Sequence, residues 1–185
     1  RMKPGVEDAF RESISSSPIG WVRWYSTPTV PGVGVAAVYD RSDQRRYFLM
    51  CPSCNERQAL SWEENIEQTS GPENLLDLKR VNPDIQIAPG TFSLVCRRCR
   101  NSFPPLQTLD PDDGEWVAEF PSRLDVRGYQ LSQLYCPWHN PDSLAAKIGD
   151  LRFTQHWRNY VLGEAYRGDG VMLDEAAILD RKSTR

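Results

Sequence analysis

Two cysteine pairs with the same internal spacing constrain this chain more than any other feature. Each pair follows an apolar, strand-like run, residues 47–50 before the first pair and residues 91–95 before the second. A C-x2-C turn places two sulfur atoms in one short loop, and two such turns supply the four thiolates that structural Zn²⁺ binds tetrahedrally. The four predicted ligands are Cys51, Cys54, Cys96 and Cys99.

The interval between the pairs is long. Residues 55–95 separate them, more than the 15 to 20 residues of the common zinc motif, so we expect this interval to carry its own substructure. Within it we expect Trp62 to cover the metal site. Unrelated buried cysteines or disulfides are the alternative, but matched turns after matched strands favour zinc. Four thiolates close the coordination shell, which disfavours a catalytic metal.

Composition narrows the class of protein. The formal net charge of -3 excludes a globally basic nucleic-acid binder, and 39% hydrophobic with 25% charged residues is an ordinary globular balance. No apolar run approaches the roughly 20 residues needed to span a bilayer. Paired cysteines at ribbon-like turns suit a reducing cytoplasm better than a disulfide framework. We therefore expect a cytoplasmic protein without a membrane partner.

Arginines are concentrated near the cysteine pairs. Such a basic cluster can bind the phosphates of DNA, or it can offset the net charge of -2 that four thiolates around Zn²⁺ carry. The sequence leaves both interpretations open. The candidate DNA contacts are Arg45, Arg46, Arg97, Arg98 and Arg100.

Hydrophobic periodicity predicts short helices and strands around these pairs. We expect Trp157, Tyr160 and Val161 to face the core, and Gly163 to cap the last helix. The predicted helices are residues 5–15, a segment opening at 141–143, and 153–162, and residues 34–39 are interpreted as a short helix or turn. Residues 63–68 are expected to begin a helix, and residues 75–81 are of uncertain type. The predicted strands are residues 21–25, 47–50, 57–62, 91–95, 115–120 and 128–135.

Several groups contain residue types found in catalytic or metal-binding sites, but we do not expect them to form such a site. Asp110, Asp112 and Asp113 are interpreted as a solvated turn, because proline and glycine surround them. Cys136 and His139 form a C-x2-H pair without two further ligands, so we expect a free, buried Cys136. His156 is expected to be a packing or surface residue. No G-x4-G-K-[ST] phosphate-binding loop occurs in the sequence.

An ordered set of motifs resembles the large terminase subunit of tailed bacteriophages, in the branch with a zinc-ribbon-like insertion. The resemblance covers roughly residues 5–170. Its motifs are Ser26-Thr27-Pro28-Thr29-Val30-Pro31-Gly32, Ser42-Asp43-Gln44-Arg45, the two cysteine pairs, Leu134-Tyr135-Cys136-Pro137-Trp138 and Asn159-Tyr160-Val161-Leu162-Gly163.

The resemblance implies a DNA-packaging motor. In that family an ATPase drives double-stranded DNA into procapsids, and a nuclease cuts the concatemers. By resemblance, Ser26, Thr27 and Thr29 belong to the motif that couples nucleotide state to DNA movement. ATP and Mg²⁺ would serve only the full-length protein. The implied partners are double-stranded DNA, the small terminase subunit, the portal and further copies of the full-length motor, in the cytoplasm of the bacterial host.

The expected fold is α+β, with a zinc-ribbon-like β subdomain flanked by short strands and helices. We expect residues 1–40 to end an ATPase-like domain, residues 41–105 to form the zinc-ribbon-like insertion, and residues 106–185 to lead toward a nuclease domain. Because Walker motifs and nuclease acids are absent from the sequence, we expect a non-catalytic fragment. A free-standing zinc-ribbon adaptor for nucleic acid or protein is the alternative.

Overall fold

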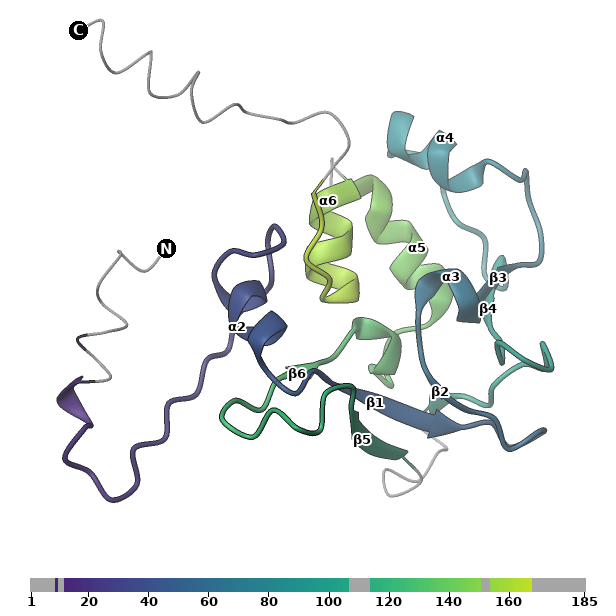
Figure 1. Cartoon of the computed structure of the whole chain (residues 1–185). Helices are drawn as coiled ribbons and strands as arrows, with labels where there is room; N and C mark the ends of the chain where they lie inside the picture. Colours follow the sequence, from purple (N-terminus) through teal and green to yellow (C-terminus); the bar gives the residue numbers. More distant parts are fainter. Residues whose placement is uncertain (1–8, 10–11, 107–113, 151–153, 168–185) are drawn as a thin grey trace, which may run out of the picture.

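The structure is a computed structural model that describes all residues except 1–8, 10–11, 107–113, 151–153 and 168–185. It confirms the α+β class (Figure 1). The helices and strands, in chain order, are α2 (Val35–Arg41), β1 (Arg45–Met50), β2 (Arg57–Ala59), α3 (Trp62–Asn65), β3 (Ile66–Gln68), α4 (Leu75–Val81), β4 (Phe92–Leu94), β5 (Gly114–Ala118), β6 (Tyr129–Gln130), the 3-10 helix η3 (Gln133–Tyr135), α5 (Pro141–Asp150), α6 (Thr154–Trp157) and the π-helical η4 (Arg158–Leu162).

Strand β1 is the centre of the larger sheet. Antiparallel β5 pairs along most of one edge, from Arg45 opposite Ala118 to Leu49 opposite Gly114. The other edge is shared by parallel β6 at the start of β1 and antiparallel β2 at its end. The expected linker thus supplies two strands to the same sheet as the first cysteine arm. Strands β3 and β4 form a separate antiparallel pair in the interval between the cysteine pairs.

The main core lies between this sheet and the C-terminal helices. Figure 1 shows α5 and α6 over one side of the β1–β2–β5 sheet. Leu49 from β1 packs there with residues of α5, α6 and η4. The buried members are Leu49, Leu60, Leu134, Leu144, Ile148, Trp157, Val161 and Leu162.

A tyrosine hydroxyl completes the ladder where β1 and β2 separate. Phe48 opposite Ala59 is the last β1–β2 pair, and the next backbone groups are bridged by Tyr135. Its hydroxyl donates to the carbonyl oxygen of Tyr47 at 2.5 Å and accepts from the N–H of Leu60 at 2.6 Å. Burial, above all, raises the pKa of Tyr135 to about 12, so the hydroxyl stays protonated as this donor role requires.

The strand predicted at residues 21–25 is not formed. These residues are extended with alternating exposure, as in a strand, but no described strand pairs with them. Trp21 and Tyr25 are exposed by 76% and 85%. In Figure 1 this segment runs outside the packed body as an arm. The strand prediction for this segment is therefore wrong, because a strand also needs a backbone partner.

Three further predictions differ from the structure, two in the bounds of an element and one in the burial of a side chain. The expected strand over residues 128–135 shortens to β6, because Ser132 caps the 3-10 turn that follows. Residues 63–68 divide between α3 and β3 instead of continuing one helix. Tyr160 is 57% exposed and does not face the core as predicted.

The C-terminal helices follow the prediction more closely. Gly163 has φ 66° and caps η4 as expected, because this left-handed conformation favours glycine. Trp157 and Val161 are buried as predicted, and Leu144 and Ile148 of α5 are buried with them. Most of the predicted helix at residues 5–15 and the three aspartates of the predicted turn fall outside the described residues. Among the helices that the structure describes, none has the length and apolarity to cross a membrane.

We predict that Tyr135→Phe destabilises the fold through the lost bridge alone. The substitution leaves the Leu60 N–H and the Tyr47 carbonyl without their bridging partner, which costs about 1–3 kcal/mol for buried polar groups. Tyr160→Phe is the matched control, since that ring is mostly exposed. Denaturant unfolding of the two variants measures the difference. Equal stabilities would contradict a structural role for the Tyr135 hydroxyl.

Candidate metal centre

The two cysteine pairs form two knuckles with the same backbone hydrogen bonds. In the first knuckle the Cys51 N–H donates to Glu56 O and the Asn55 N–H donates to Cys51 O, both at 2.9 Å. In the second knuckle the Cys96 N–H donates to Asn101 O at 2.9 Å, and the Arg100 N–H donates to Cys96 O at 3.0 Å.

The turns of the two knuckles also match in backbone conformation. The residue after each second cysteine, Asn55 or Arg100, has a positive φ, 57° and 58° respectively. A positive φ is uncommon outside glycine, and asparagine adopts it more readily than arginine does. Its recurrence at equivalent positions shows that both loops turn in the same way. The predicted knuckles are therefore confirmed as local structures.

The knuckles bring all four thiols together. Their sulfur atoms lie within 4.8 Å of one another, with 3.8 Å between Cys51 and Cys99 and 3.7 Å between Cys54 and Cys96. Four ligands at a Zn–S distance of about 2.3 Å define a tetrahedron whose edge is about 3.8 Å. A disulfide would need its sulfur atoms about 2 Å apart. The arrangement therefore fits a tetrahedral metal ion, and all five cysteines are free thiols.

An apolar shell excludes water from one side of these thiols. Cys51 and Cys96 are buried together with Phe103, and Leu94 packs against them. The predicted cover, Trp62, lies elsewhere. Ser61 caps α3 by accepting a hydrogen bond from the Glu64 N–H, and Trp62 then packs on Trp157, with ring centroids 4.8 Å apart. Phe103 occupies the place that the sequence assigned to Trp62.

The thiols have opposed proton affinities before any metal binds. Burial raises the pKa of Cys96, but hydrogen bonds from the Cys99 N–H, the Gln58 amide and the Arg98 N–H lower it to about 6. For Cys54, a hydrogen bond from the Glu56 backbone lowers the pKa, whereas burial and hydrogen bonds with the other three thiols raise it to about 12. Cys96 is therefore better prepared than Cys54 to act as a thiolate.

The arginines near the knuckles are paired with carboxylates. Arg97 contacts Glu56 at 2.7 Å, Arg98 lies 3.6 Å from Glu56, and Arg100 lies 3.0 Å from Glu67. Arg97 also lies 3.9 Å from Glu64, and all three acids come from the interval between the pairs. The ion pairs give the arginines protein partners, which favours a structural role over a free basic surface.

Arg45 and Arg46 lie away from the knuckles. They begin β1, whose far end leads to Cys51, and at about 3.3 Å per residue the separation approaches 20 Å. The Arg45 guanidinium is held by buried Asp43 at 2.7 Å, and this hydrogen bond raises the pKa of Arg45 further. The five candidate DNA contacts therefore do not form one patch.

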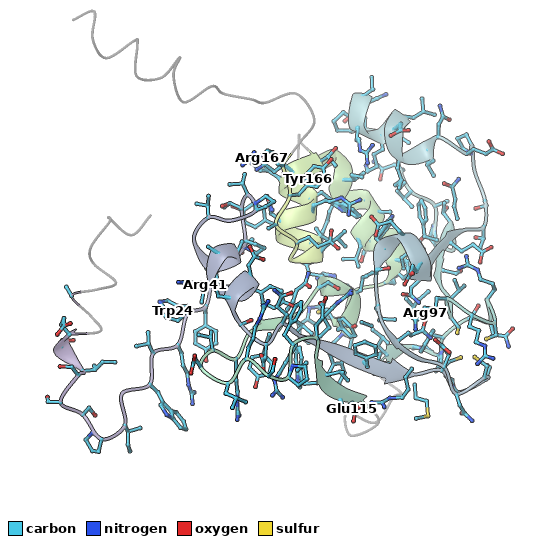
Figure 2. All side chains as sticks on the ribbon, in the orientation of Figure 1. Trp24, Arg41, Arg97, Glu115, Tyr166 and Arg167 are labelled. Carbon is cyan, nitrogen blue, oxygen red and sulfur yellow. The ribbon has the colours of Figure 1, made fainter. Side chains whose placement is uncertain are left out.

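The predicted coupling residues lie in the arm at the other side of the molecule. Figure 2 shows Trp24 of this arm and Arg97 of the second knuckle on opposite sides. Ser26 and Thr27 are exposed and line an open groove of about 1210 Å³. The Thr29 carbonyl oxygen accepts hydrogen bonds from the Asn159 side-chain amide at 2.6 Å and the Tyr166 N–H at 3.0 Å.

Cys136 and the histidines stay outside the metal cluster. Cys136 is half-buried instead of fully buried, and among the described residues only the four knuckle cysteines form a group able to hold a metal. The His139 ring lies 3.2 Å from Lys147 Nζ. Burial and this ammonium both lower the pKa of His139. His156 stacks edge-on against Tyr160, in keeping with a surface role.

Two buried amides complete the site, and the sequence did not single them out. Gln58 and Asn65 are both fully buried, and the Gln58 side chain donates to Cys96 Sγ at 3.2 Å. A polar residue at a strand position carries no signal of such a contact, since the partner lies far along the chain. The only sequence feature that could have drawn attention to Gln58 is its position four residues after Cys54.

Comparison with protein families identifies the chain. Residues 18–116, which include both knuckles, match the family model described as phage terminase large subunit gpA, ATPase domain. The match covers more than half of the sequence, and the chain therefore belongs to this family. Searches of curated proteins and of solved structures gave no significant match.

We predict that the reduced protein binds Zn²⁺ with release of protons. Near neutral pH the Cys54 thiol keeps its proton until the metal displaces it, and below pH of about 6 the Cys96 proton must also leave. Affinity should therefore fall more steeply with acidification below that point. Calorimetry in buffers of different ionisation enthalpy measures the protons, and Cys136→Ser is the matched control. Metal binding that survives Cys51→Ser and Cys96→Ser together would contradict the assignment.

Proposed function

We propose that this chain forms the zinc-binding region of a phage terminase large subunit and supports ATP-driven packaging of double-stranded DNA into procapsids. The observation that carries the proposal is that the family match contains both knuckles, whose four sulfur atoms have tetrahedral spacing. The zinc is structural and the region itself is non-catalytic. The working acids and phosphate loop of the ATPase and endonuclease would belong to the full-length protein, in the host cytoplasm.

Each of the three predicted segments has its own proposed role. We propose that residues 1–40 end the ATPase-like part, residues 41–105 form the zinc-ribbon-like insertion, and residues 106–185 lead toward the nuclease. In keeping with this, Ser26, Thr27 and Thr29 would couple nucleotide state to movement. Support comes from Asn159, a buried residue of the last resembling motif, whose side-chain amide donates to the carbonyl oxygen of Thr29. The small terminase subunit and the portal are the proposed protein partners.

We predict that loss of the metal lowers DNA packaging far more than it lowers ATP hydrolysis. In a terminase large subunit carrying this chain, Cys51→Ser with Cys96→Ser should lower packaging by roughly tenfold or more, because a metal-dependent subdomain loses its fold without the ion. ATP hydrolysis should change far less, since four thiolates leave no open coordination position for chemistry. Packaging into procapsids and phosphate release are measured on the same preparations.

The control for this experiment is Cys136→Ser, which removes a thiol outside the cluster. Unchanged packaging by the double variant, with zinc shown to be absent, would contradict a role in the motor. That result would favour the alternative function, a zinc-ribbon adaptor that binds protein or nucleic acid outside the motor.

DNA contact by the knuckle arginines leads to a separate prediction. If Arg97, Arg98 and Arg100 each bind a phosphate, their joint replacement by alanine should weaken duplex binding and reduce the salt dependence of log K by about 2 to 3. Replacement of Arg45 and Arg46 tests the other end of β1 as an independent contact. Unchanged affinity and salt dependence would assign the knuckle arginines to the ion pairs with Glu56 and Glu67.

A further inference from the structure

We infer that Gln58 and Asn65 are positioning residues of the metal centre, which hold the second knuckle against the first and fix the position of the Cys96 sulfur. The inference rests on the zinc site proposed above and adds the residues that prepare it. Both side chains are fully buried, and amide groups of this size are costly to bury unless their hydrogen bonds are made.

The two amide side chains form hydrogen bonds with three consecutive residues of the second knuckle. Gln58 Nε2 donates to Cys96 Sγ at 3.2 Å, and Gln58 Oε1 accepts from the Arg97 N–H at 2.9 Å. Asn65 Nδ2 donates to Val95 O at 2.9 Å, while the Val95 N–H donates back to Asn65 O at 2.8 Å. The second knuckle is thereby fixed to a strand and a helix that follow the first knuckle.

The amides also fix each other. Asn65 Nδ2 donates to Gln58 Oε1 at 2.7 Å, and Asn65 Oδ1 accepts from the Ser61 N–H at 3.0 Å. The oxygen of Gln58 must face the Arg97 N–H, because a backbone N–H can only donate. The remaining atom, which faces Cys96 Sγ, is therefore the NH2 group. The hydrogen-bond network itself thus determines the orientation of both side chains.

This orientation matters to a metal ligand. An N–H aimed at sulfur favours the thiolate over the thiol, and it disperses part of the charge that four thiolates bring to one ion. It also fixes the sulfur position before the metal arrives, which reduces the ordering that binding must supply. Partners of this kind commonly change metal affinity by 10–100-fold when they are removed.

The test compares metal affinity among variants of the whole chain. Gln58→Leu keeps the approximate volume and removes the donor, and we expect it to weaken Zn²⁺ binding by roughly 10–100-fold in competition with a chelator. Gln58→Glu should weaken binding further, because it sets a carboxylate against the thiolates. Gln68→Leu is the matched control, since the Gln68 side chain donates to Ser70 O and Pro72 O, away from the sulfur atoms.

A second variant covers the case in which Gln58→Leu fails to fold. Asn65→Asp keeps an acceptor for the Ser61 N–H but loses both donors, so it should also weaken binding. Co²⁺ provides a further readout. Loss of the N–H to Cys96 Sγ should shift the thiolate-to-cobalt charge-transfer band, which a purely structural role would not do.

The outcomes separate the two proposals. If the unaltered chain binds neither Zn²⁺ nor Co²⁺ when reduced, the metal centre itself is refuted. If it binds metal and both variants match Gln68→Leu in affinity and spectrum, only the positioning role is refuted. Equal loss of stability in the metal-free and metal-loaded forms would likewise reduce Gln58 and Asn65 to packing residues.

Discussion

Closure of two knuckles around one tetrahedral site is the constraint on which this structure depends. The first knuckle extends from the β1–β2 hairpin, and the second follows β4, which belongs to a different sheet. Strands of only three residues, such as β2, β3 and β4, have little stability of their own. Sulfur atoms from both knuckles approach within 4.8 Å, so an ion there would join two sheets that share no strand pairing. The metal would thus substitute for a larger core.

Local chemistry explains what the sequence could predict. The knuckles, the return strand β2 and the glycine cap at Gly163 each depend on a few neighbouring residues. The knuckles and the cap were found where predicted, whereas β2 begins at Arg57 as predicted but ends at Ala59 instead of residue 62. The prediction for Trp62 was wrong because one local signal was missed. Ser61 with Glu64 at the third following position is a helix-capping pattern, and the helix that it starts directs Trp62 toward Trp157 instead of the thiols.

Long-range contacts explain what the sequence could not predict. Gln58 meets Cys96 across the interval that separates the knuckles, and no periodicity or motif links the two positions. The same holds for Arg100 and Glu67, whose pairing changes how the basic residues are understood. Residues 21–25 have the composition of a strand but form none, because a strand forms only with a paired neighbour.

The groove beside the arm and the four knuckle thiols lie at opposite ends of β1, which limits how one can influence the other. Asp43 binds the backbone of Gly128 beside the groove at the start of β1, whereas Cys51 follows the end of the same strand. Strand β1 is paired along both edges, with β5 on one and with β6 and β2 on the other. An ion at the knuckles would therefore hold the far end of this strand in place and would not switch it, because a switch would need an element with two stable positions.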